Sequence, residues 1–100
     1  MNHRSETMTV VSPRNLKLFV TGDAPRSKRA RANLAEALER IGLDPDAVPE
    51  IDLSADPVQT LTFGIFATPA LLRTSEAGDT EVLYGDLSER RALERFLALG

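Results

Sequence analysis

The chain has 100 residues, of which 42% are hydrophobic and 27% are charged; this composition fits a single domain with one core and is too apolar for a disordered chain. The formal net charge of −3, from 12 basic and 15 acidic residues, provides no basic surface of the kind that general nucleic-acid binding requires. The chain has no cysteine, which excludes disulfides, thiolate metal sites and dithiol redox chemistry.

The N-terminal segment is polar and without periodicity, so we expect a flexible leader over 1–14 and a single folded domain over 15–100. This segment lacks the charged-then-apolar order of a secretory signal, and no apolar run in the chain approaches the roughly 18 residues of a membrane span. The sequence therefore predicts a cytoplasmic protein with no membrane or nucleic-acid partner. The one histidine, His3, lies in the leader, and we expect no role for it.

Residues 16–20 form a short apolar run that a Thr-Gly-Asp turn closes, a pattern typical of a buried strand. A helix is predicted over 27–41, because apolar residues recur there at spacings of three and four. We expect Ser27 or Asp23 to cap its start and Gly42 to end it. The predicted core stripe of this helix consists of Ala30, Leu34, Ala37, Leu38 and Ile41.

Residues 47–53 are predicted to form a second strand. Pro49 has no N–H to donate to a ladder, so this strand is expected at an edge of the sheet. A short, marginal helix follows, in which Asp56 is expected to be the N-cap and Pro57 the first helical residue. Its apolar face is predicted to consist of Val58, Leu61 and Ile65.

A third strand is predicted over 67–74 and a fourth over 81–84, joined by a hairpin loop. The last helix is predicted over 88–99. Asp86, just before it, and Glu89, in its first turn, have the spacing of a capping box. The apolar side chains expected in the core of this region are Tyr84, Ala92, Leu93, Phe96 and Leu97.

The predicted order of elements is βαβαββα, which describes an α/β domain of thioredoxin-like architecture: a mixed four-stranded sheet with three helices and the second strand at an edge. A thioredoxin-like chain carries its redox pair where the first strand turns into the first helix, and Ala24-Pro25-Arg26-Ser27 stands there without sulfur. Such a fold also usually carries a cis proline before its third strand, and we expect Thr68-Pro69 to be that cis peptide bond.

Four motifs resemble the KaiB family of circadian clock proteins, in order and at similar spacing over residues 15–99. They are LKLFVTGDAPRS at 16–27, IDL at 51–53 followed by Asp56-Pro57, FATPAL at 66–71 and GDLS at 85–88. Each motif alone is a weak signal, whereas four motifs in order are specific. By this resemblance, the structural motif residues of the fold are Thr68, Pro69, Gly85, Asp86 and Ser88.

The resemblance implies a non-enzymatic KaiB-like adaptor that binds the ATPase ring of a KaiC-type protein. The same thioredoxin-like module also occurs as the sensor domain of a clock-associated histidine kinase, which competes for that ring. The alternative implied function is therefore an interaction module of a signalling kinase system. Family members switch between a tetramer-forming fold and a thioredoxin-like, partner-binding fold, so fold switching and self-association as a dimer or tetramer are also implied.

A basic run at the start of the first helix contains Arg26, Lys28, Arg29 and Arg31. Positive charge at a helix N-terminus opposes the helix dipole, so these residues do not serve to stabilise the helix. We interpret them either as a partner-binding patch for an acidic surface or as an ordinary solvated face; Arg29 matches a basic position of the KaiB family. Both Arg29 and Arg31 are expected to face solvent.

The sequence offers no nucleophile with a neighbouring base, so we predict no catalytic residue, no metal ligand and no cofactor. The competing enzymatic interpretation is a glutathione-transferase-like fragment in which Ser27 replaces a cysteine. A serine is a poor nucleophile without a base, which argues against this interpretation.

Two departures from the KaiB family are informative. Gly64 stands where the family has a lysine in the second helix, which bears on partner affinity, and the loop at 75–80 lacks the family's prolines, which bears on the fold. Residues 88–99 contain no glycine, proline or β-branched residue, and Arg90 and Glu94 are spaced to form an ion pair. We therefore expect the thioredoxin-like fold to be the resting state, with 88–99 helical and the protein monomeric or dimeric.

Overall fold

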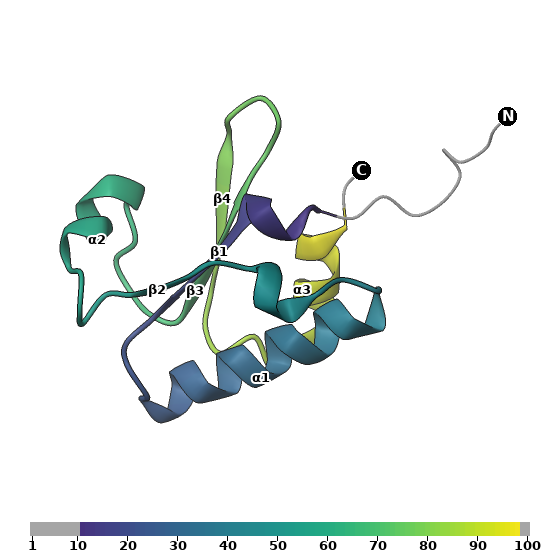
Figure 1. The fold of residues 1–100 in the computed structure, drawn as a ribbon, viewed down its shortest axis with the longest axis horizontal. Helices are drawn as coiled ribbons and strands as arrows, with labels where there is room; N and C mark the ends of the chain where they lie inside the picture. Colours follow the sequence, from purple (N-terminus) through teal and green to yellow (C-terminus); the bar gives the residue numbers. More distant parts are fainter. Residues whose placement is uncertain (1–10, 99–100) are drawn as a thin grey trace, which may run out of the picture.

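The computed structural model describes residues 11–98, which form a four-stranded sheet flanked by three helices (Figure 1). The strands are β1 (Leu16–Val20), β2 (Glu50–Asp52), β3 (Ala70–Thr74) and β4 (Thr80–Tyr84). The helices are α1 (Pro25–Arg40), α2 (Val58–Phe63) and α3 (Arg90–Leu97), with short 3-10 turns η2 at Pro13–Asn15 and η3 at Pro45–Ala47. His3 and most of the predicted leader lie outside the described residues.

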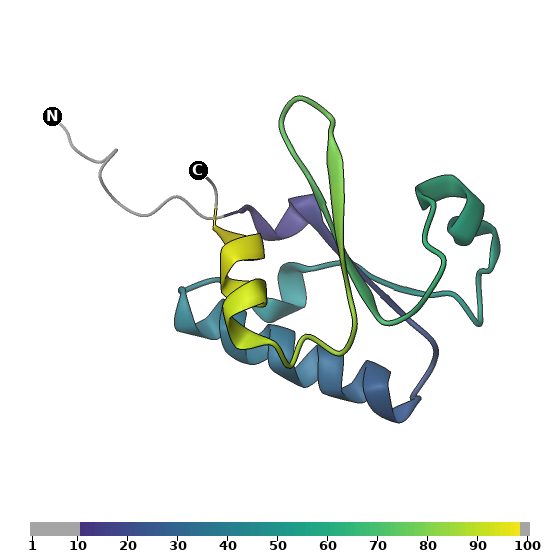
Figure 2. The same cartoon turned by 180° about the vertical axis from the view of Figure 1, so that it is seen from behind.

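The strands lie in the order β2-β1-β3-β4, so the predicted βαβαββα order and the edge position of β2 are confirmed. β1 pairs with β2 in parallel, whereas β3 is antiparallel to both of its neighbours, β1 and β4. Two opposite views show α1 and α3 together on one side of the sheet and α2 away from them (Figure 1, Figure 2). One face of the sheet is therefore covered by α1 and α3, and the other is covered only in part, by Phe63 of α2 and the segment that follows it.

Each face of the sheet has its own core. Leu16, Leu18 and Val20 of β1 pack against α1 and α3, whereas Phe19 packs on the opposite face with Ile65. This follows from the alternation of side chains along a strand. The core faces predicted for the first and last helices are confirmed, since the buried residues there are Ala30, Leu34, Ala37, Leu38, Leu93 and Leu97.

The helix α2 is short, as predicted, but it ends at Phe63, before Ile65, and lacks the predicted apolar face. Val58 and Leu61 are 64% and 86% exposed, whereas Ile65 is buried. Phe63 packs against the sheet instead, because a helix of less than two turns cannot present one continuous stripe. Gly64 ends α2 in the left-handed conformation, with φ +69 and ψ 26, which explains a glycine at this position.

The edge strand β2 is shorter than predicted, because Pro45–Ala47 form η3 instead of the start of the strand. The Asp44 carboxylate begins that turn by accepting a hydrogen bond from Asp46 N–H at 2.9 Å. Pro49 precedes β2 and contributes its carbonyl oxygen, which accepts from Leu18 N–H at 2.9 Å. A proline fits here because the bond to β1 uses its acceptor and needs no donor.

The predicted cap of α1 is wrong, because the polar residues chosen for it bond elsewhere. The helix begins with Pro25, and no side chain caps it. Ser27 lies inside the first turn and accepts a hydrogen bond from Thr21 N–H at 3.0 Å, while Asp23 faces Arg31 at 3.5 Å. The predicted end is confirmed, since Gly42 follows the helix with φ +83.

The predicted caps of α2 and α3 are also wrong. The N-cap of α2 is Pro57, and Asp56 accepts a hydrogen bond from the side chain of Gln59 instead. The N-cap of α3 is Glu89, without a side-chain cap bond. Asp86 lies too far ahead of the helix and accepts from the N–H of Ser88 within its own turn, at 3.1 Å.

α3 is shorter than the helix predicted over 88–99, and the fold begins earlier than predicted. Ala98 is extended, with φ −86 and ψ 140, and position 99 lies outside the described residues. Val11 is buried, and its N–H donates to the carbonyl of Leu97 at 3.0 Å. The packed part of the described chain therefore includes Val11, ahead of the predicted start at Asn15, because this apolar side chain packs in the α1–α3 core.

Val11→Ala tests whether this part of the predicted leader belongs to the core. The substitution is expected to lower the free energy of unfolding by about 2 kcal/mol, because it removes buried methyl groups and leaves a cavity. The control is Arg14→Ala, which changes an exposed residue of the same segment and should alter that free energy by less than about 0.5 kcal/mol. Urea denaturation measures both, and equal midpoints contradict the packed position of Val11.

Candidate functional site

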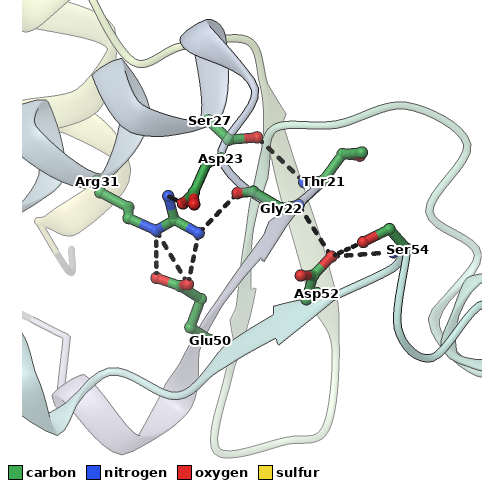
Figure 3. Close-up of polar contacts among 8 residues, drawn as sticks. All are labelled: Thr21, Gly22, Asp23, Ser27, Arg31, Glu50, Asp52 and Ser54. Atoms are coloured by element: carbon green, nitrogen blue, oxygen red, sulfur yellow. Dashed lines mark hydrogen bonds and ion pairs between the residues drawn. The ribbon is translucent and has the colours of Figure 1, made fainter.

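The turn between β1 and α1 is held by the guanidinium of Arg31 (Figure 3). Its Nε donates to both carboxylate oxygens of Glu50 on β2, each at 3.0 Å, and its Nη2 donates to the carbonyl of Gly22 at 2.9 Å. Asp23 Oδ1 lies 3.5 Å from Nη1. The hydrogen bond to Glu50 is the main cause that raises the pKa of Arg31. We call these four residues the Arg31 clasp, which joins α1, the turn and the edge strand.

The carboxylate of Asp52 holds the other side of the same turn (Figure 3). Its Oδ1 accepts hydrogen bonds from Gly22 N–H at 2.9 Å, Ser54 N–H at 3.0 Å and Ser54 Oγ at 2.6 Å. These donors lower the pKa of Asp52, the Ser54 hydroxyl most strongly. Gly22 has φ +48 and bonds through both its N–H and its carbonyl, so its left-handed conformation is fixed from both sides.

Ser27 stands where the enzymatic interpretation needs a nucleophile. Its side chain is buried, and its Oγ accepts the hydrogen bond from Thr21 N–H. The Thr21 hydroxyl in turn pairs with that of Thr68 at 2.5 Å, beside the Thr68-Pro69 peptide bond, which is cis as predicted. No histidine occurs in residues 11–98 to act as a base. The geometry therefore assigns structural bonds to these polar atoms and argues against catalysis by Ser27.

The GDLS segment at 85–88 is fastened to α1 by two contacts. Arg29 Nε donates to Asp86 Oδ2 at 3.1 Å, and Asn33 Nδ2 donates to the Asp86 carbonyl at 2.9 Å. Hydrogen bonds from the Ser88 side chain, first, and from Arg29 lower the pKa of Asp86 to about 2. These contacts make the segment a docked turn that precedes α3, and they give Asp86 and Ser88 a structural role.

The structure divides the predicted basic patch into paired and open cations. Arg31 belongs to its clasp and has a side chain that is only 30% exposed, which corrects the expectation that it faces solvent. Arg29 pairs with Asp86 but keeps 55% of its side chain exposed. Arg26 and Lys28 are exposed, and no carboxylate within 11–98 lies at salt-bridge distance from either. We call Arg26 and Lys28 the open cations.

An aromatic pair lies at the end of β4, near Arg26. Phe66 and Tyr84 stack with ring centroids 4.5 Å apart, and they are 81% and 36% exposed. A shallow hollow of about 220 Å³ at the same strand end is lined by Tyr84, Gly85 and Arg26, among others. We call Phe66 and Tyr84 the aromatic ledge.

The aromatic ledge corrects the prediction that Tyr84 belongs to the core. The alternation of β4 places Tyr84 on the same face as Val82, which packs beside Phe63 of α2. That signal was available in the sequence. What the sequence did not reveal is that α2 covers only part of this face, so the ring at the strand end stays open to solvent.

Residues 11–98 contain no cluster of three histidine, cysteine, aspartate or glutamate side chains suited to a metal ion. In the same part of the chain, no helix has the length and apolar character to cross a membrane.

Arg31→Glu tests the clasp. We expect the free energy of unfolding to fall by about 2 kcal/mol, because charge-assisted hydrogen bonds are lost and the new carboxylate faces Glu50 and Asp23. Lys28→Glu makes the same change of charge on an exposed position of the same helix and should shift that free energy by less than about 0.5 kcal/mol. Urea denaturation compares the two, and equal losses contradict a structural role of Arg31.

The docked GDLS turn makes a prediction about pH. The pKa of Asp86 lies near 2 in the folded protein, below the ordinary value of about 3.9, so the contribution of its carboxylate to stability is complete above about pH 4 and is lost as the pH falls through about 2. A carboxyl-carbon NMR titration should give that midpoint in the wild type. Arg29→Gln should move the midpoint upward, toward 3.9; an unchanged midpoint contradicts the Arg29 contact.

No protein-family model matches this chain, and no curated protein matches it. Among solved structures, the chain is similar to the solution structure of the N-terminal domain of SasA from Synechococcus elongatus, at 19% sequence identity and a TM-score of 0.55. The alignment covers 96% of this chain and 87% of that domain. At this identity the likeness concerns the fold alone, and with the strand order it confirms the predicted thioredoxin-like architecture.

Proposed function

We propose that this protein is a non-catalytic, KaiB-like circadian clock adaptor that binds the ATPase ring of a KaiC-type protein. One observation carries the proposal. At the turn where a thioredoxin-like fold has its redox pair, the polar groups of Thr21, Gly22 and Ser27 are bonded within the protein. Chemistry is disfavoured there, whereas exposed charge and aromatic surface lie next to it.

The exposed surface has the composition of a protein interface. Arginine and aromatic residues are enriched among the residues that contribute most to binding, and Arg26 adjoins Tyr84 of the aromatic ledge in one hollow. Lys28 adds a second exposed charge to the first turn of α1, on a different side of the helix from Arg26. An acidic partner surface with an apolar patch fits this arrangement, and charges of this kind also accelerate association.

Two sources support the KaiC-type ring as the partner. The four motifs that resemble the KaiB family include the strand, turn and helix start that carry Arg26. The fold is similar to the N-terminal domain of SasA. Under this proposal, a clock-associated histidine kinase that carries the same module competes for the ring.

The second candidate is an interaction module of a signalling kinase system. The likeness to SasA favours it, since that structure is an N-terminal domain that the alignment covers over 87% of its length. Because the kinase-borne module also competes for the ring, ring binding does not separate the two candidates. Stable binding to a purified histidine kinase, or a kinase gene beside this one, favours the signalling module over the adaptor.

Reversal of the open cations tests the proposed surface. Arg26→Glu combined with Lys28→Glu is expected to weaken binding to the organism's KaiC-type protein at least about tenfold at low salt, because two attractive contacts become repulsive. The effect should shrink as salt screens the charges. The variant should remain folded, since neither side chain forms a salt bridge within residues 11–98.

The matched control is Arg14→Glu combined with Arg95→Glu. Both residues are exposed, and they carry the same change of charge on η2 and on the last turn of α3. Calorimetric titration with the ring should give the wild-type affinity for this control. Unchanged affinity of the Arg26–Lys28 variant contradicts the proposed surface, and no binding by the wild type overturns the adaptor proposal itself.

A further inference from the structure

The two edges of the sheet are unequally protected against pairing with another strand. β2 has three residues, follows Pro49 and carries Glu50 of the Arg31 clasp. β4 has five residues, Thr80–Tyr84, without proline or lysine, and its one charged residue, Glu81, pairs with Arg73 of the neighbouring strand β3. Short length, proline and charge are the usual means by which proteins keep an edge strand unpaired. Within the described chain, β4 is therefore the edge that is open to another strand.

The ladder between β3 and β4 fixes which groups of β4 point outward. Ser75 N–H donates to the Asp79 carbonyl at 2.8 Å, and Gly85 N–H donates to the Pro69 carbonyl at 2.9 Å. Hydrogen-bonded and non-hydrogen-bonded pairs alternate in an antiparallel ladder, so Glu81 and Leu83 bond to β3. The N–H and C=O groups of the alternate residues, which are Thr80, Val82 and Tyr84, therefore point away from the sheet.

We propose that β4 pairs with β4 of a second copy of this chain, antiparallel about Val82. In this register Val82 lies opposite Val82 of the second copy, and Tyr84 lies opposite Thr80 of the second copy. Every outward N–H and C=O of the three residues then has a partner. β-branched and aromatic cross-strand pairs are favourable, and the pairing sets no like charges directly opposite each other.

Charge complementarity specifies the second copy as the occupant. In the same register Asp79 of one copy lies opposite Gly85 of the other. A Cβ built at Gly85 would lie 4.0 Å from Arg26 Nη2, so this position faces the open cation. Asp79 is exposed and shares the face of Glu81 by strand alternation. The two-fold axis therefore brings Asp79 of each copy toward Arg26 of the other.

The pairing also covers part of the aromatic ledge. Thr80 of the second copy lies beside Tyr84, on the face where Phe66 is 81% exposed. The inference does not depend on the proposed ring partner, because it rests on the strand edge and the charges alone. Arg26 belongs both to the proposed ring-binding surface and to the β4–β4 interface. A partner that forms an ion pair with Arg26 therefore competes with the second copy.

Sedimentation of the purified full chain over a concentration series tests the dimer. We expect a monomer–dimer equilibrium in which the dimer is populated at or below about 1 mM. Val82→Pro removes an outward N–H that β3 does not use, so it should raise the dimer dissociation constant at least about tenfold while the far-ultraviolet circular dichroism is retained. Hydrogen exchange at Val82 and Tyr84 should slow as the concentration rises.

A charge exchange tests the register without altering the strand. Arg26→Glu and Asp79→Arg should each raise the dimer dissociation constant about threefold, and the double variant should restore it to within about twofold of the wild type. Lys28→Glu is the control for charge and should leave the constant unchanged. A protein that is monomeric at all concentrations overturns the proposal, and so does a dimer that neither Val82→Pro nor the charge exchange affects.

Discussion

The planar guanidinium of Arg31 determines how the first half of the fold fits together. It reaches two carboxylates and one backbone carbonyl that belong to β2 and to the β1–α1 turn, and a rigid fork of donors suits such a set better than an ammonium group does. The clasp therefore fixes where α1 starts relative to β1. Because Arg31 is used in this way, the exposed charge at the start of α1 is left to its neighbours, chiefly Arg26 and Lys28.

The turn that Arg31 holds lies where a thioredoxin-like fold has its redox pair, but it contains no sulfur. Thr21 N–H donates to the Ser27 hydroxyl, and the Thr21 hydroxyl pairs with that of Thr68, next to the cis Thr68-Pro69 bond. Gly22 N–H donates to the Asp52 carboxylate. Buried polar groups are stable only when they have partners, and here those partners lie within the protein. A nucleophile needs a nearby base, and the bonds of this turn are those of a structural element. The exposed surface around the turn is therefore the better candidate for a functional role.

Local pattern in the sequence was sufficient for the element order, the edge strand and the core stripes of α1 and α3, because periodicity and proline act within a few residues. Local pattern did not predict the helix caps or the ion pairs of the basic residues, because the partners of these side chains are distant in the chain. Asp86 has the spacing of a capping residue, yet Arg29 and the turn at Ser88 hold it. Likewise, alternation along β4 is enough to place Tyr84 on the face of Val82, whereas the limited reach of α2, which makes the ring exposed, depends on the tertiary structure.

α3 is held in place from both ends as well as by its own helical preference. Its first turn follows the segment whose Asp86 carbonyl and carboxylate bond to Asn33 and Arg29 of α1. Near its last turn, Arg73 of β3 donates to the carbonyl of Phe96, and Val11 N–H donates to that of Leu97. A fold that draws this segment into a strand has to break these bonds and separate Leu93 from the α1 core. The attachments of α3 thus favour the thioredoxin-like arrangement independently of the sequence of the helix itself.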